Sequence, residues 1–234
     1  MKSLKYWLLV LGILSCFGCS SSIHEDNRGC SFICDSIQYR VEFMSAGCVR
    51  ILSYPEGDTL VTKRLVVDVE KPTFTDYKWE ETEQAFVFCT HELLVSFDKS
   101  DEAFTFREAS TGKLLLKEKD RRKARNFKRS EVGGEQCLEV TQRFIPTDEE
   151  AIYGLGQYQN GIMNYRGKSV LLLQANMDIV NPFLISTNGY GILWDNYSST
   201  KFEDTSEGYS FISEVGDASD YYFVYGKNMD EVVA

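Results

Sequence analysis

The chain has 234 residues, of which 43% are apolar and 13% aromatic, with four prolines and seventeen glycines. This length and composition suit one large domain, or two small ones, whose core needs no disulfides, and they argue against long disordered stretches. The net charge of −10 argues against a nucleic-acid partner, because binding to phosphates requires a cationic surface. A neutral partner such as a glycan fits this charge better.

The N-terminus has the pattern of an export signal. Residues 1–18 combine two lysines with an apolar run, Tyr6–Leu14, which is too short to span a bilayer. Cys19 precedes three serines, an arrangement that resembles a bacterial lipoprotein cleavage site. We therefore expect a lipoprotein-type signal peptide over residues 1–18, a lipid on Cys19 and a tether over residues 19–35, which would anchor the protein in the bacterial envelope, in the periplasm or at the outer-membrane surface. The residues two and three positions before Cys19 depart from the usual site, so simple secretion or an uncleaved anchor stay open as alternatives.

Cysteine and histidine usage limits the chemistry. After Cys19, five cysteines remain, at positions 30, 34, 48, 89 and 137, and an odd number cannot pair completely within one chain. The two histidines, His24 and His91, are too few for a convincing zinc site or a Ser/His/Asp nucleophile. We predict no metal and no cofactor, and we interpret the cysteines as buried small side chains with one disulfide at most.

Alternation of apolar and polar residues dominates the chain from residue 36 onward. Over residues 36–43, Ile37, Tyr39, Val41 and Phe43 alternate with polar residues, which predicts a strand with one buried and one wet face. The same pattern predicts further strands at Val49–Tyr54, Leu65–Val69, Ala85–Cys89, Leu93–Phe97, Ala103–Arg107, Lys113–Leu116 and Cys137–Phe144. Turn sequences at 99–102 and 110–113 predict two hairpins. Regular strand spacing indicates an all-β sandwich over residues 36–227.

Later strands are more continuously apolar, which predicts positions inside a large sheet with both faces covered. These strands are Ser169–Gln174, Phe183–Ser186, Gly191–Trp194 and Tyr221–Tyr225. We expect Trp194 in the core. The glycines of 154–161 predict a sharp loop, because a phosphate-binding loop would need a helix after it.

Two charged stretches are interpreted as solvated. The basic run 120–129 predicts a loop or a charge-protected edge strand, and the acidic residues 148–150, like Glu80 and Glu81, predict a polar turn.

The C-terminus starts a helix. Asn228 is an N-cap residue with Glu231 three positions later, which is the spacing of a capping box. So few helical residues do not sustain themselves, and we expect residues 228–234 to begin a helix that the natural polypeptide continues.

One polar loop stands between two apolar strands and is the candidate binding site. Asn176 and Asp178 lie in residues 174–183, where rigid flanking strands could hold a binding group in place. The alternative is an Asx-type turn in which both side chains bond their own backbone.

Several motifs resemble the N-terminal domain of glycoside hydrolase family 31, and more weakly its bacterial α-xylosidases. They are Ile152–Gln157, Asn164–Tyr165, Asn176–Asp178, Asn181–Ser186, Gly189–Asn196 and Asp220–Gly226. The resemblance implies a galactose-mutarotase-like sandwich that precedes a (β/α)₈ barrel carrying both catalytic aspartates, so that this chain contains no catalytic residue. It also implies that Asp178 hydrogen-bonds substrate hydroxyls, with Asn176 beside it.

From this resemblance we expect a carbohydrate-binding and scaffolding domain of an α-xylosidase or α-glucosidase, which hydrolyses glycosidic bonds only with the barrel present. Its partners would be an oligosaccharide, the barrel of the same polypeptide and, through the lipid, a membrane. The alternative functions are a free-standing glycan-binding lipoprotein without enzymatic activity and a scaffold with no independent role.

Overall fold

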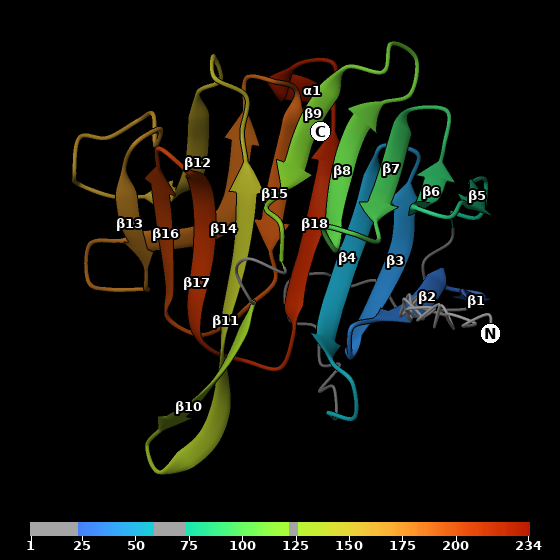
Figure 1. The fold of residues 1–234 in the computed structure, drawn as a ribbon. Helices are drawn as coiled ribbons and strands as arrows, with labels where there is room; N and C mark the ends of the chain where they lie inside the picture. The colour runs from blue at the N-terminus through green and yellow to red at the C-terminus, as the bar shows by residue number, and fades with distance from the viewer. Residues whose placement is uncertain (1–22, 59–73, 122–125) are drawn as a thin grey trace, which may run out of the picture.

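The computed structural model describes residues 23–58, 74–121 and 126–234. They form two antiparallel sheets that face each other (Figure 1), so the predicted all-β sandwich with a C-terminal helix is confirmed. The signal peptide over residues 1–18, Cys19 and the strand expected at Leu65–Val69 lie outside the described residues.

Each sheet is ordered as a continuous antiparallel array. The first sheet holds, in spatial order, β1 (His24–Glu25), β2 (Cys30–Cys34), β3 (Ile37–Ser45), β4 (Cys48–Pro55), β18 (Ser219–Tyr225), β15 (Tyr190–Trp194), β14 (Ile179–Ser186) and β12 (Ile152–Gln157). The second holds β13 (Ser169–Leu172), β16 (Thr200–Thr205), β17 (Gly208–Gly216), β11 (Glu135–Ile145), β9 (Leu114–Glu118), β8 (Ala103–Glu108), β7 (Leu93–Asp98), β6 (Ala85–Cys89) and β5 (Lys78–Glu81). A further strand, β10 (Phe127–Val132), pairs with the start of β11 and forms a hairpin that extends beyond the sheet (Figure 1).

The core lies between the sheets and is rich in aromatic side chains. Tyr39, Val41 and Phe43 are buried, as their alternation in β3 predicted. Phe106 of β8 stacks on Phe223 of β18 with ring centroids 4.2 Å apart, which joins the two sheets directly. Trp194 is completely buried and belongs to this core, as expected.

The N-terminal part of the sandwich starts earlier than the sequence predicted. The tether expected over residues 19–35 is wrong for its second half, because β1 already pairs with β2, and β2 pairs with β3. Cys30, Phe32 and Cys34 are buried in the core. A five-residue strand after a polar segment gives too short an alternation to recognise, and its partners supply its stability.

The basic run 120–129 is not a purely solvated loop. Arg121 is buried and its Nη2 donates to Glu118 Oε1 at 2.7 Å and to Gln142 Oε1 at 3.1 Å. Glu118 also accepts from the hydroxyl of Tyr221 at 2.8 Å and the backbone N–H of Phe104 at 2.8 Å. The guanidinium is retained inside because a buried carboxylate and several polar groups compensate its lost hydration.

Two further carboxylates expected on wet surfaces are buried. Glu150, placed by sequence in a polar turn, accepts from the hydroxyl of Ser186 and from the backbone N–H of Thr147 at 2.8 Å. Glu42, expected on the wet face of β3, forms ion pairs with Arg40 at 2.7 Å and Arg50 at 3.0 Å. Two arginines close in sequence compensate the burial of Glu42, whereas Glu150 depends on Ser186, 36 positions away.

The strand predicted at Ser169–Gln174 is not covered on both faces. It is shorter, β13, and it forms one edge of the second sheet. Leu171 and Leu173 are about half exposed, at 51% and 48%. Its apolar sequence therefore does not reflect a central position in the sheet.

The short helix α1 (Met229–Val233) ends the chain, as predicted. The side chain of Asn228 accepts from the backbone N–H of Glu231 at 3.0 Å, and Glu231 Oε2 accepts from the backbone N–H of Lys227 at 3.0 Å. Val232 is buried against Gly191 and Gly226. Within the described residues, no helix has the length and apolar character needed to cross a bilayer.

Candidate functional site

The loop that carries Asn176 and Asp178 crosses from one sheet to the other at the side of the sandwich. It leaves β13, an edge strand of the second sheet, and enters β14, next to the edge strand β12 of the first sheet (Figure 1). The turn is closed by a hydrogen bond from the backbone N–H of Asp178 to the carbonyl oxygen of Ala175 at 3.3 Å. Gln174 Oε1 accepts from the backbone N–H of Val180 at 3.2 Å, which ties the two ends of the loop together.

The two candidate side chains face outward from this turn. Asn176 is exposed and Asp178 is half-buried, and within the described part of the chain neither side chain forms a hydrogen bond. The Asx-type turn that was the alternative interpretation would require such bonds to the backbone; the turn closes through main-chain atoms instead. An amide and a carboxylate are therefore free to bind hydroxyl groups of a ligand.

Strand β12 pairs with the start of β14 and so fixes the position of the Asp178 turn. Gly154, Leu155 and Gly156 have φ values of 96°, 65° and 116°, and the pairing with β14 shifts register between the two glycines. A Cβ atom on Gly156 would lie 2.0 Å from the carbonyl oxygen of Ile179, so only glycine allows this approach. The sharp loop predicted for 154–161 is thus a bulged strand followed by a loop.

Tyr158 connects the bulge with the candidate aspartate. Its hydroxyl donates to the carbonyl oxygen of Leu155 at 3.0 Å. Burial, with smaller contributions from the nearby Tyr165 and Asp178, raises the pKa of Tyr158 to about 12. The phenol therefore stays protonated at neutral pH and keeps its hydrogen bond to Leu155.

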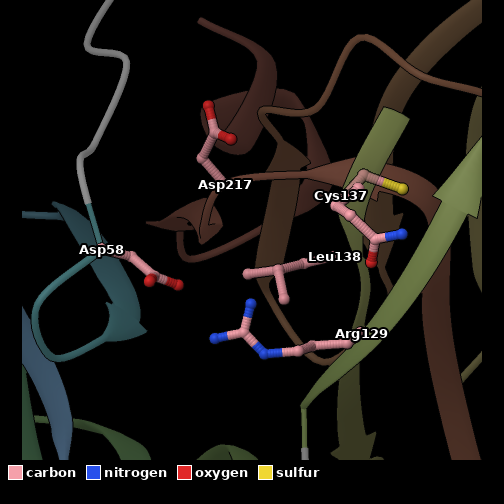
Figure 2. Close-up of a pocket in the computed structure, with 6 residues that line it drawn as sticks. Asp58, Arg129, Cys137, Leu138 and Asp217 are labelled. Carbon is pink, nitrogen blue, oxygen red and sulfur yellow. The ribbon is translucent and has the colours of Figure 1, made fainter. Parts of the chain in front are cut away.

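A separate hollow of about 200 Å³ lies at the base of the β10–β11 hairpin. Figure 2 shows the guanidinium of Arg129 reaching toward Asp58, with Asp217 above it. The hollow is smaller than the roughly 300–1,000 Å³ of typical ligand pockets, and a cation, Arg129, lines it together with the two carboxylates. Its small volume and the cation among its lining residues do not favour glycoside hydrolysis, which uses two carboxyl groups that face an open sugar site.

The described residues hold no cluster of three or more His, Cys, Asp or Glu side chains of the kind that binds a metal. All five cysteines after Cys19 are free thiols. Cys30 and Cys34 are buried, whereas Cys89 is exposed, so the interpretation as buried small side chains holds for only part of the set.

Comparison with known proteins decides the family. The profile of the glycosyl hydrolase 31 N-terminal galactose mutarotase-like domain matches residues 38–203. The chain belongs to glycoside hydrolase family 31. An α-xylosidase from Saccharolobus solfataricus is 32% identical over 213 residues, which cover 85% of this chain and 27% of that enzyme.

Solved structures of family 31 agree with this assignment. The α-xylosidase from Xanthomonas citri is 31% identical with a TM-score of 0.65, covering 78% of this chain and 20% of that protein. An α-xylosidase from a soil metagenome, solved with xylose, has a TM-score of 0.76 at 20% identity and covers 91% of this chain and 33% of its own; at that identity it shows the fold alone. The family 31 domain described here thus spans about a quarter of the length of the α-xylosidase from Saccharolobus solfataricus.

Proposed function

We propose that this chain is the N-terminal domain of a larger α-glycosidase of the α-xylosidase or α-glucosidase type, to which it contributes one wall of the sugar site. The observation that carries the proposal is the Asp178 turn: a carboxylate without an internal hydrogen bond on a loop that β12 and Gln174 hold in place. The similarity to α-xylosidases over 85% of the chain supports the substrate class. Xylose and glucose residues carry hydroxyl groups, from which such a carboxylate can accept hydrogen bonds.

Catalysis in this proposal belongs to the polypeptide that follows the domain. Hydrolysis of a glycoside uses two carboxyl groups that flank the scissile bond, whereas the Asp178 turn contains a single carboxylate. Asp178 and Asn176 would orient the substrate, and the barrel aspartates that the family resemblance implies would form and break the bonds.

The first experiment compares the chain with the longer gene product on aryl α-xylosides and aryl α-glucosides. We expect turnover from the longer product and none from the 234-residue chain. Turnover by the purified chain that persists through repeated purification would refute the assignment of catalysis. Calorimetric binding of an oligosaccharide by the chain alone would favour the free-standing glycan-binding lipoprotein instead.

The role of Asp178 is tested by Asp178→Ala in the longer product. A hydrogen bond to a charged group contributes about 1.5–3 kcal/mol, so kcat/KM should fall about 10- to 100-fold. The unfolding midpoint should stay unchanged, because the side chain of Asp178 has no hydrogen-bond partner among the described residues. The matched control is Asp148→Ala, which removes an exposed aspartate outside the site. Equal kcat/KM values for the two variants would show that Asp178 does not bind the sugar.

The location in the bacterial envelope is also proposed, from the Cys19 motif alone. Labelling with a radioactive fatty acid in a bacterial host should mark the wild-type chain and leave Cys19→Ala unlabelled. Because β1 begins at His24, a lipid on Cys19 would hold the β1 side of the sandwich within a few residues of the membrane.

A further inference from the structure

The hollow at the base of the β10–β11 hairpin brings together side chains from three segments that are distant in the sequence. Asp58 follows the turn at the end of β4, Arg129 lies on β10, and Asp217 lies between β17 and β18. The volume of about 200 Å³ is too small for a drug-sized ligand and suits a smaller one. The Asp178 turn contributes none of the described lining residues, so the hollow is separate from the proposed sugar site.

Side chains of opposite charge face this hollow. Figure 2 shows the guanidinium of Arg129 and the carboxylate of Asp58 turned toward each other, with the side chain of Leu138 beside them. Among the described residues, the side chains of Asp58, Arg129 and Asp217 form no ion pair and no hydrogen bond. A direct ion pair between exposed side chains stabilises a protein little, so the fold gains little by closing the gap between them. The space between the charges is therefore open to a ligand.

The backbone holds the charged groups on separate, supported segments. Arg129 is paired with Leu138 in the β10–β11 ladder, and Leu138 is paired on its other side with Gly216 of β17. The backbone N–H of Asp58 donates to the carbonyl oxygen of Pro55 at 3.2 Å, which fixes the start of the segment after β4. A ligand that enters the hollow therefore finds its walls already formed, which lowers the cost of binding.

The arrangement of charges restricts the class of ligand. An anion such as phosphate would be attracted by one guanidinium and repelled by two carboxylates. A simple cation would leave Arg129 without a counter-charge, and the described residues hold no group of three His, Cys, Asp or Glu side chains that would bind a metal. A zwitterion carries one charge of each sign. Its carboxylate can accept two hydrogen bonds from a guanidinium, and its ammonium group can donate to carboxylates.

We propose that the hollow binds a small zwitterion, an α-amino acid whose carboxylate lies on Arg129 and whose ammonium group lies on Asp58. Asp217 adds a second negative charge at the rim, and Leu138 supplies an apolar wall for a small aliphatic side chain. The ligand bridges two charges that the fold leaves unpaired. This inference is independent of the proposed function, because it uses neither Asp178 nor the polypeptide that follows the domain.

Titration of the ¹⁵N-labelled chain with L-alanine, followed by NMR, tests the site. We expect saturable amide shifts around residues 129, 136–138 and 217, with a dissociation constant on the order of 1 mM. Arg129→Gln and Asp58→Asn should each weaken binding about tenfold or more, and added salt should weaken it as well. The matched control is Lys128→Gln, which removes the neighbouring cation of β10, an exposed partner of Glu139, and should bind like the wild type.

Acetate, methylammonium and xylose are titrated in parallel, and none should bind as tightly as L-alanine because each lacks at least one of the two charges. Arg129 and Asp58 are exposed, so the urea midpoints of their variants should equal that of the wild type, which separates lost binding from lost folding. Three results would overturn the site: no shifts around the hollow with L-alanine, equal binding of any of the three other probes, or undiminished binding by Arg129→Gln. Equal binding of xylose would identify the hollow as a sugar site instead.

Discussion

Substitution of Gly156 by alanine tests whether β12 positions the candidate loop. Gly156 has a φ of 116°, and an added Cβ would lie 2.0 Å from the carbonyl oxygen of Ile179 and 2.9 Å from the amide nitrogen of Asn181. Both atoms belong to the backbone of β14, so no side-chain rotation relieves the contact. The strand must move, and the Asp178 turn, which immediately precedes β14, must move with it.

The structure supplies a matched control for the size of the effect. Gly161 also has positive φ, 69°, but an added Cβ there would meet no atom within 4 Å. Gly161→Ala should therefore lower the free energy of unfolding only by the cost of placing an L-residue at positive φ, about 1 kcal/mol. Gly156→Ala carries a similar term and adds the overpacking of a rigid neighbour, about 1–3 kcal/mol, for a total of about 3 kcal/mol.

Urea unfolding of the purified chain distinguishes the two variants. With a slope of about 3 kcal/mol per M, the midpoint should fall by about 1 M for Gly156→Ala and by about 0.3 M for Gly161→Ala. In the longer gene product, adding Asp178→Ala to Gly156→Ala should lower kcat/KM no further, because the carboxylate has already been displaced. Equal midpoint losses for the two glycine variants would refute the positioning role of β12.

Three further predictions concern the interior. Arg121→Met should lower the free energy of unfolding in urea by about 3–5 kcal/mol, because it leaves the Glu118 carboxylate buried without its cation. Adding Glu118→Leu should recover part of the loss. A loss below about 1 kcal/mol for Arg121→Met alone would contradict a stabilising role of the Arg121–Glu118 pair. Burial raises the pKa of Glu150, so the folded state binds the proton more tightly than the unfolded state, and the free energy of unfolding should decline as pH rises above about 4.5, the ordinary glutamate value. Glu150→Gln should remove this pH dependence from the urea midpoints measured between pH 4 and 8. Identical pH profiles for the wild type and the variant would exclude the effect. Iodoacetamide at pH 8 should alkylate the exposed Cys89 well before Cys30, as followed by mass spectrometry. Burial raises the pKa of Cys30 to about 11, so only about one Cys30 thiol in a thousand is ionised at this pH. Equal labelling rates would show that Cys30 is accessible.

The sequence predicts the sandwich well because its strands carry their own signal. In β3, three apolar residues at alternate positions all enter the core, and the expected N-cap hydrogen bond of α1 forms between the backbone N–H of Glu231 and Asn228 Oδ1. Each of these features depends on residues a few positions apart. Local spacing is therefore sufficient to place them.

Two of the errors have a different origin, since they concern charges that depend on partners distant in the chain. Arg121 lies in a run of cations three positions after Glu118, and the pair is buried beside Ser53, 68 positions away, whose hydroxyl accepts from Arg121 Nη1 at 2.9 Å. Glu150 lies beside two other acids, and its partner Ser186 is 36 positions away. Charged side chains are normally expected at the surface, and only the assembled fold supplies the polar groups that compensate their burial.

The candidate turn is an intermediate case. Sequence located Asn176 and Asp178 between two apolar strands, but it could not show that these strands belong to different sheets. It also could not distinguish an apolar strand in a sheet centre from one at an uncovered edge, because both have the same composition. β13 is the second kind.

Polar contacts close both sides of the sandwich. At the β1 side, the carboxylate of Glu25 accepts from the hydroxyl of Tyr77 at 3.1 Å and from the indole N–H of Trp79 at 3.0 Å, so aromatic side chains at the start of β5 are tied to the opposite sheet. At the β13 side, the segment between β12 and β13 makes the connection: Asn164 Oδ1 accepts from the backbone N–H of Ile152 in β12 at 3.1 Å, and Arg166 Nη1 donates to Asp204 of β16 at 2.7 Å. Within the described residues the side chain of Asp178 takes part in neither closure. A carboxylate on a supported turn that the fold does not use for its own stability is available to orient a ligand.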